Sequence, residues 1–306
     1  MVFSVLIVVL AIIAKIFIGQ TRQVNLTYYS LWEDPAVMAG VINDYQRLHP
    51  NVKIELLRQN QIQYKDRIMA ALQTKSGPDI VRIHSTWTPL FRSLLEPVPS
   101  DVISVSQFKS TFYPTASTDL ILSGKIYALP LEIDGLVMFA NTDLLNKAGL
   151  TPATTWEDFQ EQVQHLTVKD QSGRIQTAGT SLGTTGNVDH WQDVLALMFM
   201  QNNAKVEQPI GLAAEGALSF YTDYVKKLGV WDETQDASTV AFAKGRVAYY
   251  FGPTWRYFDI KELSKNSRLN FKIVPVPQIS GEPVAVTQSS YWAEAVSAQS
   301  PNKREA

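Results

Sequence analysis

Glu132 and Asp134 are the residues whose type and spacing point most directly to chemistry. In an extended run, positions two apart face the same side, and their Cα atoms lie about 7 Å apart. That separation is compatible with the carboxylate pair of a glycoside hydrolase, and equally with two acceptors for sugar hydroxyls. A solvated polar strand edge is the third interpretation. Spacing alone leaves all three open.

Tryptophan is the second chemical signal, because the chain contains seven of them. The flat apolar face of an indole suits the C–H face of a sugar ring, while nearby carboxylates accept hydrogen bonds from the hydroxyls. Any single tryptophan is more often packed in a core. Four of them, however, fall near expected strand ends or loops, and this number favours a ligand-binding surface: Trp32, Trp87, Trp255 and Trp292.

Composition argues against several other kinds of site. The chain has no cysteine, which excludes disulfides, thiolate metal sites and a cysteine nucleophile, and its four histidines never approach a two-histidine zinc spacing. A net charge of −2, without a basic run among aromatics, disfavours nucleic acid as a partner. No phosphate-binding loop is present, and the serine-elbow-like stretch 179–183 lacks a strand leading into it. We therefore expect no cofactor and no metal.

The elements that must position these residues alternate between strand and helix. The first five are a strand at 23–29, a helix at 37–48, a strand at 52–57, a helix at 64–72 and a strand at 79–83. This order predicts a parallel α/β sheet, whose ligands bind at the carboxyl ends of the strands. The loops that leave those ends carry Glu33 and Asp34 in one case and Trp87 in the other.

The middle of the chain continues the alternation. Thr155 and Asp158 form a plausible capping box, and Gly229 is suited to end a helix. The remaining predictions are extended segments within 127–140, a helix at 159–166, a polar stretch at 177–187, helices at 191–200 and 218–228, and a strand at 246–251.

The first twenty residues differ from the rest. Residues 1–14 are almost wholly apolar, Lys15 interrupts them, and the apolar run resumes at 16–18. We interpret residues 1–20 as an export signal or a short membrane anchor, with a buried strand as the alternative. No later stretch is apolar enough to cross a bilayer. The expected location is extracytoplasmic, in the periplasm or on the outer face of the cytoplasmic membrane, with export or anchoring by residues 1–18.

Seven motifs, in their order and spacing, resemble family 1 of the bacterial extracellular solute-binding proteins, the sugar receptors of ABC importers, which include the maltose-binding protein. They span nearly the whole chain after the apolar segment. The motifs are Gly77–Ile80, Gly124–Pro130, Leu131–Leu150, Thr155–Phe159, Phe242–Trp255, Pro275–Gln278 and Tyr291–Ser297.

The resemblance implies a two-lobed periplasmic-binding-protein-like α/β fold, each lobe a mainly parallel sheet flanked by helices. The first lobe is expected from 22–131 plus 279–306 and the second from 136–275, with a hinge near 131–136 and 275–279. The ligand would lie in the cleft between the lobes, and hinge closure would trap it, a motion known for periplasmic binding proteins.

The resemblance also implies binding residues. Glu132 matches a position that hydrogen-bonds sugar, and Trp255 matches an aromatic that stacks on the ring. Trp87 follows the third strand, where members often place a ligand-contacting aromatic or acid, and Glu33 and Asp34 follow the first, where a polar contact is common. The geometry of such a cleft adds four further candidates: Asp134, Arg256, Tyr291 and Trp292.

The function implied is reversible capture of a sugar or oligosaccharide by a monomer that delivers it to ABC transporter permease subunits, without enzymatic chemistry. Two alternatives stay open: a glycan-active hydrolase using Glu132 and Asp134, and a membrane-anchored sugar sensor. The chain departs from the family in lacking a lipoprotein cysteine, which leaves cleavage of the N-terminal segment open. Family members continue past Ser297 with further helices, so we expect the sequence to be a fragment ending early at Ala306.

Overall fold

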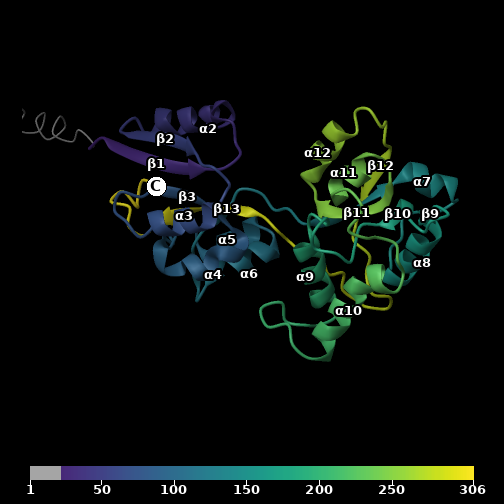
Figure 1. Cartoon of the computed structure of the whole chain (residues 1–306). Helices are drawn as coiled ribbons and strands as arrows, with labels where there is room; N and C mark the ends of the chain where they lie inside the picture. Colours follow the sequence, from purple (N-terminus) through teal and green to yellow (C-terminus); the bar gives the residue numbers. More distant parts are fainter. Residues whose placement is uncertain (1–21) are drawn as a thin grey trace, which may run out of the picture. The chain divides into compact units, whose positions relative to one another are not determined.

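A computed structural model describes residues 22–306 (Figure 1). The apolar segment 1–20 predicted as a signal or anchor lies outside the described residues. The chain forms two compact units. The first runs to Glu132 and resumes at Trp292–Ala306, and the second is Ile133–Tyr291. The chain therefore passes from one unit to the other twice, after Glu132 and after Tyr291.

The first unit is built on a mixed sheet in the order β2-β1-β3-β13-β4, with β7 also paired to β13. The first three strands run parallel, as the sequence predicts, and β13 lies antiparallel between β3 and β4. The chain's last strand therefore completes a sheet begun by its first. The bounds are β1 Val24–Ser30, β2 Val52–Arg58, β3 Ile80–His84, β4 Leu95–Glu96, β7 Leu129–Pro130 and β13 Trp292–Ser297, with a hairpin of β5 Ile121–Leu122 and β6 Lys125–Ile126.

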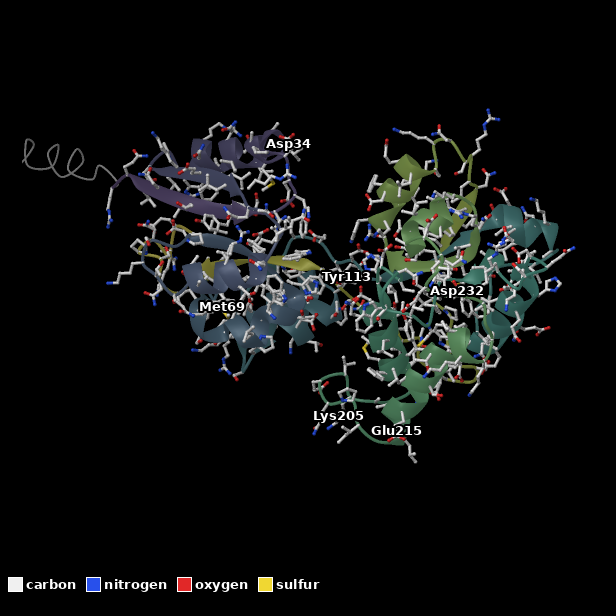
Figure 2. The ribbon with its side chains drawn as sticks, in the orientation of Figure 1. Asp34, Met69, Tyr113, Lys205, Glu215 and Asp232 are labelled. Carbon is white, nitrogen blue, oxygen red and sulfur yellow. The ribbon has the colours of Figure 1, made fainter. Side chains whose placement is uncertain are left out.

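Helices flank this sheet, with α2 on one side and α3, α4 and α6 on the other (Figure 1). Asp34 caps α2 by accepting a bond from the Ala36 N–H at 2.8 Å, and Pro35 occupies the first turn, where a missing N–H costs nothing (Figure 2). The bounds are α2 Pro35–Leu48, α3 Tyr64–Ala71, η1 Ser85–Trp87, α4 Thr88–Phe91, η2 Arg92–Leu94, α5 Val105–Thr111 and α6 Pro114–Leu120.

The second unit has a sheet in the order β12-β8-β11-β10-β9. Among its described strands, β10 and β11 run parallel and the other neighbouring pairs run antiparallel. The bounds are β8 Leu136–Asn141, β9 Val168–Lys169, β10 Ile175–Thr180, β11 Val247–Pro253 and β12 Phe271–Val274. The helices are α7 Thr142–Lys147, α8 Trp156–Leu166, α9 Trp191–Gln201, α10 Leu212–Lys226, α11 Ser238–Ala243 and α12 Arg256–Leu263.

Strand β11 explains the layering of the second unit, because all seven of its residues are buried. Successive side chains of a strand point to opposite faces. Tyr249 and Phe251 therefore pack against α8, α9 and α10 on one face, whereas Tyr250 packs against α11 and α12 on the other. A sheet covered on both faces reads in sequence as a continuous apolar run, as 247–253 does.

Two details differ from the sequence predictions, and a third agrees with them. The sheets are mixed rather than mainly parallel, because β13 enters the first sheet antiparallel and β8 pairs antiparallel in the second. The extended segments predicted within 127–140 are two strands: β7 ends at Pro130 and β8 begins at Leu136. The polar stretch 177–187 begins as strand β10, whose small residues pack closely, since Gly179 lies directly against the Val163 backbone.

The unit boundary also falls elsewhere on the return path. Residues 279–291, which the sequence analysis assigned to the first lobe, lie in the second unit. Backbone bonds hold them there, including one from the Leu136 N–H to the Gln288 carbonyl at 2.9 Å. No helix among residues 22–306 is long and apolar enough to span a membrane.

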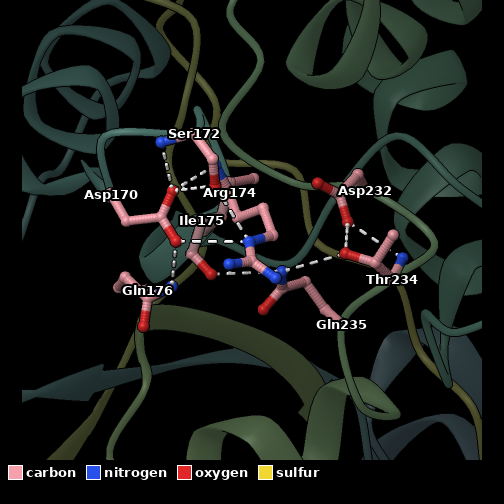
Figure 3. Close-up of polar contacts among 8 residues, drawn as sticks. All are labelled: Asp170, Ser172, Arg174, Ile175, Gln176, Asp232, Thr234 and Gln235. Carbon is pink, nitrogen blue, oxygen red and sulfur yellow. Dashed lines mark hydrogen bonds and ion pairs between the residues drawn. The ribbon is translucent and has the colours of Figure 1, made fainter.

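The turn between β9 and β10 is closed by one carboxylate (Figure 3). Asp170 Oδ1 accepts bonds from the Ser172 N–H, the Ser172 hydroxyl and the Arg174 N–H at 2.6–3.0 Å. Gly173 completes the turn in the left-handed region at φ 81°, which glycine adopts without strain. The hydrogen bonds from Ser172, the largest influence, lower the pKa of Asp170.

Candidate functional site

Three tryptophans of the first unit meet at the carboxyl end of β1 and β3 and the start of β13. We call Trp32, Trp87 and Trp292 the tryptophan cluster. Trp292 contacts Trp32 edge-on at a centroid distance of 4.7 Å and Trp87 at 5.3 Å. It also meets His84, its partner in the β3–β13 register, at 5.1 Å. Edge-to-face packing is a favourable arrangement of aromatic rings, so one indole braces the others.

A groove of about 290 Å³ opens over this cluster. Besides the three indoles, residues from the segment before α3 and from its first turn line the groove, whose surface is mostly apolar. The lining residues are Leu31, Trp32, Gln61, Gln63, Tyr64, Lys65, Trp87 and Trp292. Flat apolar walls with a few polar groups are the usual composition of a small-molecule site.

A buried arginine lies beneath the cluster. Arg82, on β3, is 1 % exposed. Its Nη1 donates to Glu33 Oε1, while its Nε donates to Glu294 Oε1 at 2.7 Å and its Nη2 donates to the same oxygen. We call Glu33, Arg82 and Glu294 the Arg82 network. Glu33 directly follows Trp32, and Glu294 stands two residues after Trp292, so the network joins the two backbone segments that carry these indoles.

The charges of this network are uneven, with two carboxylates on one guanidinium. Burial opposes ionisation of Glu33, but the bond from Arg82 and neighbouring backbone N–H groups outweigh it and lower its pKa. Burial raises the pKa of Glu294 to about 7, against the opposing pull of Arg82. Burial also raises the pKa of the nearby Tyr28 and Tyr64 phenols, so both stay neutral. Glu294 is therefore the member that titrates near neutrality.

Glu132 lies at the first passage between the units and belongs to the first. It is exposed, and its Oε1 accepts a bond from the Trp292 N–H at 3.4 Å. The Leu131 N–H also bonds to the Trp292 carbonyl at 3.3 Å. The two chain segments that pass between the units, one at Leu131–Glu132 and one at Trp292, are thus hydrogen-bonded to each other beside the tryptophan cluster.

In the second unit, Trp255 stands immediately before α12 and is 47 % exposed. The Arg256 guanidinium carbon lies 4.4 Å from its ring centroid, and His190 meets the ring edge-on at 5.9 Å. Arg256 Nη1 donates to Asp259 Oδ2 at 2.7 Å. A guanidinium over an indole face is a cation–π contact, which positions the ring while leaving part of it open to a ligand.

The bond between Arg256 and His190 sets the state of the imidazole. Arg256 Nε donates to His190 Nε2 at 2.9 Å, and a guanidinium can only donate. Nε2 therefore carries no proton, and the proton resides on Nδ1, which donates to Asp193 Oδ2 at 3.2 Å. We call His190, Asp193, Arg256 and Asp259, with Trp255, the Arg256 network.

Asp134 is occupied by contacts within the second unit. Its Oδ1 accepts bonds from the Thr254 N–H at 3.1 Å, the Thr254 hydroxyl at 2.8 Å and the Gly135 N–H at 2.6 Å. It thereby fixes the backbone just before Trp255. Asp134 and Glu132 both lie outside regular strands, so the same-face spacing assumed for a hydrolase pair does not apply.

The predicted binding residues fall into two groups and two outliers. The first unit brings together Glu33, Trp87, Glu132 and Trp292, and the second brings together Asp134, Trp255 and Arg256. Tyr291 is fully buried in the second unit, and Asp34 is an exposed helix cap. Burial removes Tyr291 from direct contact with a ligand in this structure.

Sequence reasoning missed Arg82, Glu294, His190 and Tyr64. A signal existed for the first two, since a charged residue stands in the middle of each apolar strand, DIVRI and WAEAV. A buried arginine requires a buried carboxylate, but the sequence does not say which one. Nothing in the local sequence marks His190. Among residues 22–306, no cluster of three or more histidine, aspartate or glutamate side chains is arranged to hold a metal ion.

Comparison with known families identifies proteins that are similar to this chain. A family model described as bacterial extracellular solute-binding protein matches residues 40–306. Putative binding proteins of Brucella abortus and Brucella suis are 24 % identical over 185 residues, which cover 58 % of this chain and 44 % of theirs. The chain therefore spans less than half the length of these curated relatives.

Solved structures share the fold at low identity. A sugar transporter protein from Rhizobium etli in an open conformation superimposes with a TM-score of 0.70 at 23 % identity, over 92 % of this chain and 74 % of that one. A Thermotoga lettingae solute-binding protein bound to α-D-tagatose gives 0.69 at 20 %, with the same coverage. One from Listeria monocytogenes in complex with cycloalternan gives 0.69 at 18 %, over 92 % and 73 %. The expected two-lobed periplasmic-binding-protein fold is confirmed.

Proposed function

This chain belongs to the family of bacterial extracellular solute-binding proteins, and from that membership we propose that it captures a sugar or oligosaccharide outside the cytoplasm and delivers it to an ABC transporter permease. The tagatose and cycloalternan complexes of proteins with this fold support a carbohydrate ligand. Capture and release require no covalent step, so the proposal includes no enzymatic role.

The tryptophan cluster and its groove carry the proposal. Trp32 is 41 % exposed although it packs against Trp292, so a large apolar face remains open to solvent. A pyranose C–H face would cover such a surface, and the nearby Gln61, Gln63 and Lys65 carry groups able to hydrogen-bond to hydroxyls. Lys65 Nζ already lies 5.8 Å from the Trp87 centroid.

The second unit supplies a separate indole surface. Trp255 is half-exposed and backed by Arg256, an arrangement suited to stacking on another face or another ring of the ligand. In the proposed cycle, movement about the two passages near Glu132 and Tyr291 brings ligand-contacting surfaces of both units onto the sugar. The receptor acts as a monomer, and residues 1–18 export it or anchor it to the membrane.

A sugar panel tests the assignment. We expect saturable quenching or enhancement of tryptophan fluorescence by one sugar class, with thermal stabilisation of about 2.7 kcal/mol at a ligand concentration of 100 Kd. Trp87→Ala should weaken the response, and Arg304→Gln, which alters an exposed pair with Asp101, should leave it unchanged. No response to any mono- or oligosaccharide would remove the assignment.

The same preparations distinguish the enzyme alternative. A binding protein returns the bound sugar intact, so reducing ends should not accumulate during prolonged incubation. Accumulation that disappears in Glu132→Gln would replace the receptor proposal with a glycan hydrolase. The separate contacts of Glu132 with Trp292 and of Asp134 with Thr254 favour the receptor.

A further inference from the structure

The Arg82 network connects a loop to a strand, and the two differ in how firmly they are otherwise held. Glu294 belongs to β13, which is fixed in the sheet by backbone pairing with β3, β4 and β7. Glu33 belongs to the loop between β1 and α2. That loop carries Trp32, so whatever fixes Glu33 also limits where this indole can stand.

Other contacts fix the two ends of this loop. Leu31 is buried and its carbonyl accepts a bond from Arg58 Nε at 3.1 Å, and Asp34 caps α2. Between those two points, the contact of Glu33 with Arg82 and the edge-on contact of Trp32 with Trp292 attach the loop to the sheet. The contact between Glu33 and Arg82 is an ion pair. It is largely buried, since 1 % of the Arg82 side chain and 22 % of the Glu33 side chain are exposed.

The two carboxylates compete for one guanidinium. Arg82 directs Nε and Nη2 to Glu294 and Nη1 to Glu33. When Glu294 is ionised, the three groups together carry a net negative charge in a buried place. When Glu294 is protonated, the guanidinium is left with Glu33 as its one anionic partner, and opposite charges attract most strongly where water is excluded.

Each carboxylate keeps one buried oxygen, Oε2, without a hydrogen-bond partner among the described residues, so Glu33 and Glu294 could each accept a proton there without losing a hydrogen bond. The titratable groups that face Glu294 are Tyr28 on β1, Glu33 in the following loop, Tyr64 on α3 and Arg82 on β3. Burial raises the pKa of Glu294 to about 7, whereas the pKa of Glu33 is lowered. Proton uptake near neutrality therefore occurs on the strand side of Arg82, not on the loop side.

We propose that Arg82 is a positioning residue, which holds the Trp32 loop through Glu33, and that protonation of Glu294 strengthens this hold and so raises ligand affinity as the medium becomes mildly acidic. The affinity clause rests on the proposed function, whereas the clause on the loop does not. Protonation of Glu294 would thus change how firmly Trp32, one wall of the groove, is held.

The first measurement needs no ligand. Hydrogen exchange of the peptide covering Leu31–Asp34 is compared at pH 6 and pH 8, after correction for intrinsic exchange. Because protonation of Glu294 strengthens the buried ion pair among the loop's attachments, opening of the loop should be about fivefold rarer at pH 6 in the wild type. Glu294→Gln, which cannot ionise, should show the protected behaviour at both pH values. Glu33→Gln should be unprotected at both. Replacing Arg82 itself would strand two buried carboxylates, so the test avoids it.

The second measurement uses the sugar that binds the wild type most tightly, titrated at pH 6, 7 and 8. Affinity should fall by about fivefold from pH 6 to pH 8 in the wild type and stay level in Glu294→Gln, because coupling of this size is typical between two linked sites. Glu96→Gln is the matched control: Glu96 lies on β4 in the same sheet and pairs with exposed Lys303. It should reproduce the wild-type profile.

The outcomes separate the two proposals. Identical pH profiles in wild type and Glu294→Gln, or wild-type protection of the loop in Glu33→Gln, would overturn the positioning role even if sugar binds. The exchange pattern without binding of any sugar would support the loop mechanism and remove the sugar assignment. An affinity that rises from pH 6 to pH 8 would contradict the proposed direction.

Discussion

In the first unit Trp32 and Trp87 both contact Trp292 beside a buried network of charges, whereas in the second unit Trp255 stands half-exposed beside Arg256. Arg82 is 1 % exposed, while the side chain of Arg256 is 22 % exposed and its partner Asp259 is 45 % exposed. Both arginines position an indole, but one does so in the interior and the other at the surface.

The two arginines differ in how much the protein is destabilised when an ion-pair partner moves away. A buried charge that loses its partner is strongly destabilising, so the Arg82 network permits one geometry for the segments it joins. A partly exposed pair is screened by water and contributes little stability. In the proposed function, the first unit would present a groove held mainly by buried contacts, and the second would present a half-exposed indole that can adjust to the ligand.

The largest expected effect comes from removing the buried cation. Arg82→Met should lower the free energy of unfolding by about 3–5 kcal/mol, because Glu33 and Glu294 remain buried without a counter-charge. Urea denaturation measures the loss. The double variant Arg82→Met/Glu294→Leu should recover much of it, since it removes one stranded carboxylate. A loss below about 1 kcal/mol would mean that water reaches the network, and the contrast with Arg256 would collapse.

The next effect is the pH dependence of stability. Since the pKa of Glu294 is raised from 4.5 to about 7 in the folded state, the folded chain binds more protons within that window. Its contribution is fully present below pH 4.5 and is lost as the pH rises through about 7, by an amount on the order of 3 kcal/mol. Denaturation at several pH values should show this decline, and Glu294→Gln should flatten it. An unchanged slope in that variant would assign the titration to another group.

Tryptophan replacements compare the two surfaces directly. Trp292→Ala should cost about 2 kcal/mol of binding free energy, because it removes the indole that braces Trp32 and Trp87, whereas Trp255→Ala should cost about 1 kcal/mol. Calorimetric titration with the bound sugar measures both, and thermal unfolding checks that each variant is folded. Equal losses would show that the second unit contributes as fixed a surface as the first.

The smallest effect is expected away from both surfaces. Asp170→Ala removes the acceptor that closes the β9–β10 turn, so the second unit should unfold at a slightly lower temperature with unaltered ligand affinity (Figure 3). Since the pKa of Asp170 is lowered, its contribution is present at neutral pH and is lost as the pH falls through the folded value. A change in affinity would reveal coupling between the turn and the ligand surface.

Much of the local structure was predictable. The expected strand at 52–57 and helix at 64–72 match β2 and α3 to within one residue, and Thr155 accepts the predicted bond from the Asp158 N–H. These features depend on periodicity and capping, which are encoded within a few residues. The return boundary after Tyr291 was not predictable, because it depends on residues 279–291 bonding to β8 rather than to the first sheet.

The candidate site also has a part that was predictable from the sequence and a part that was not. The sequence alone determined that indoles and carboxylates stand at strand ends, since strand direction follows from the order of the elements. Only the tertiary structure decided which of these groups stay open to a ligand. Glu33 is engaged because it pairs with Arg82, which also binds Glu294, 212 positions further along the chain. Hydrogen-bond partners are chosen by proximity in the folded chain, and no local pattern records a contact between segments so far apart.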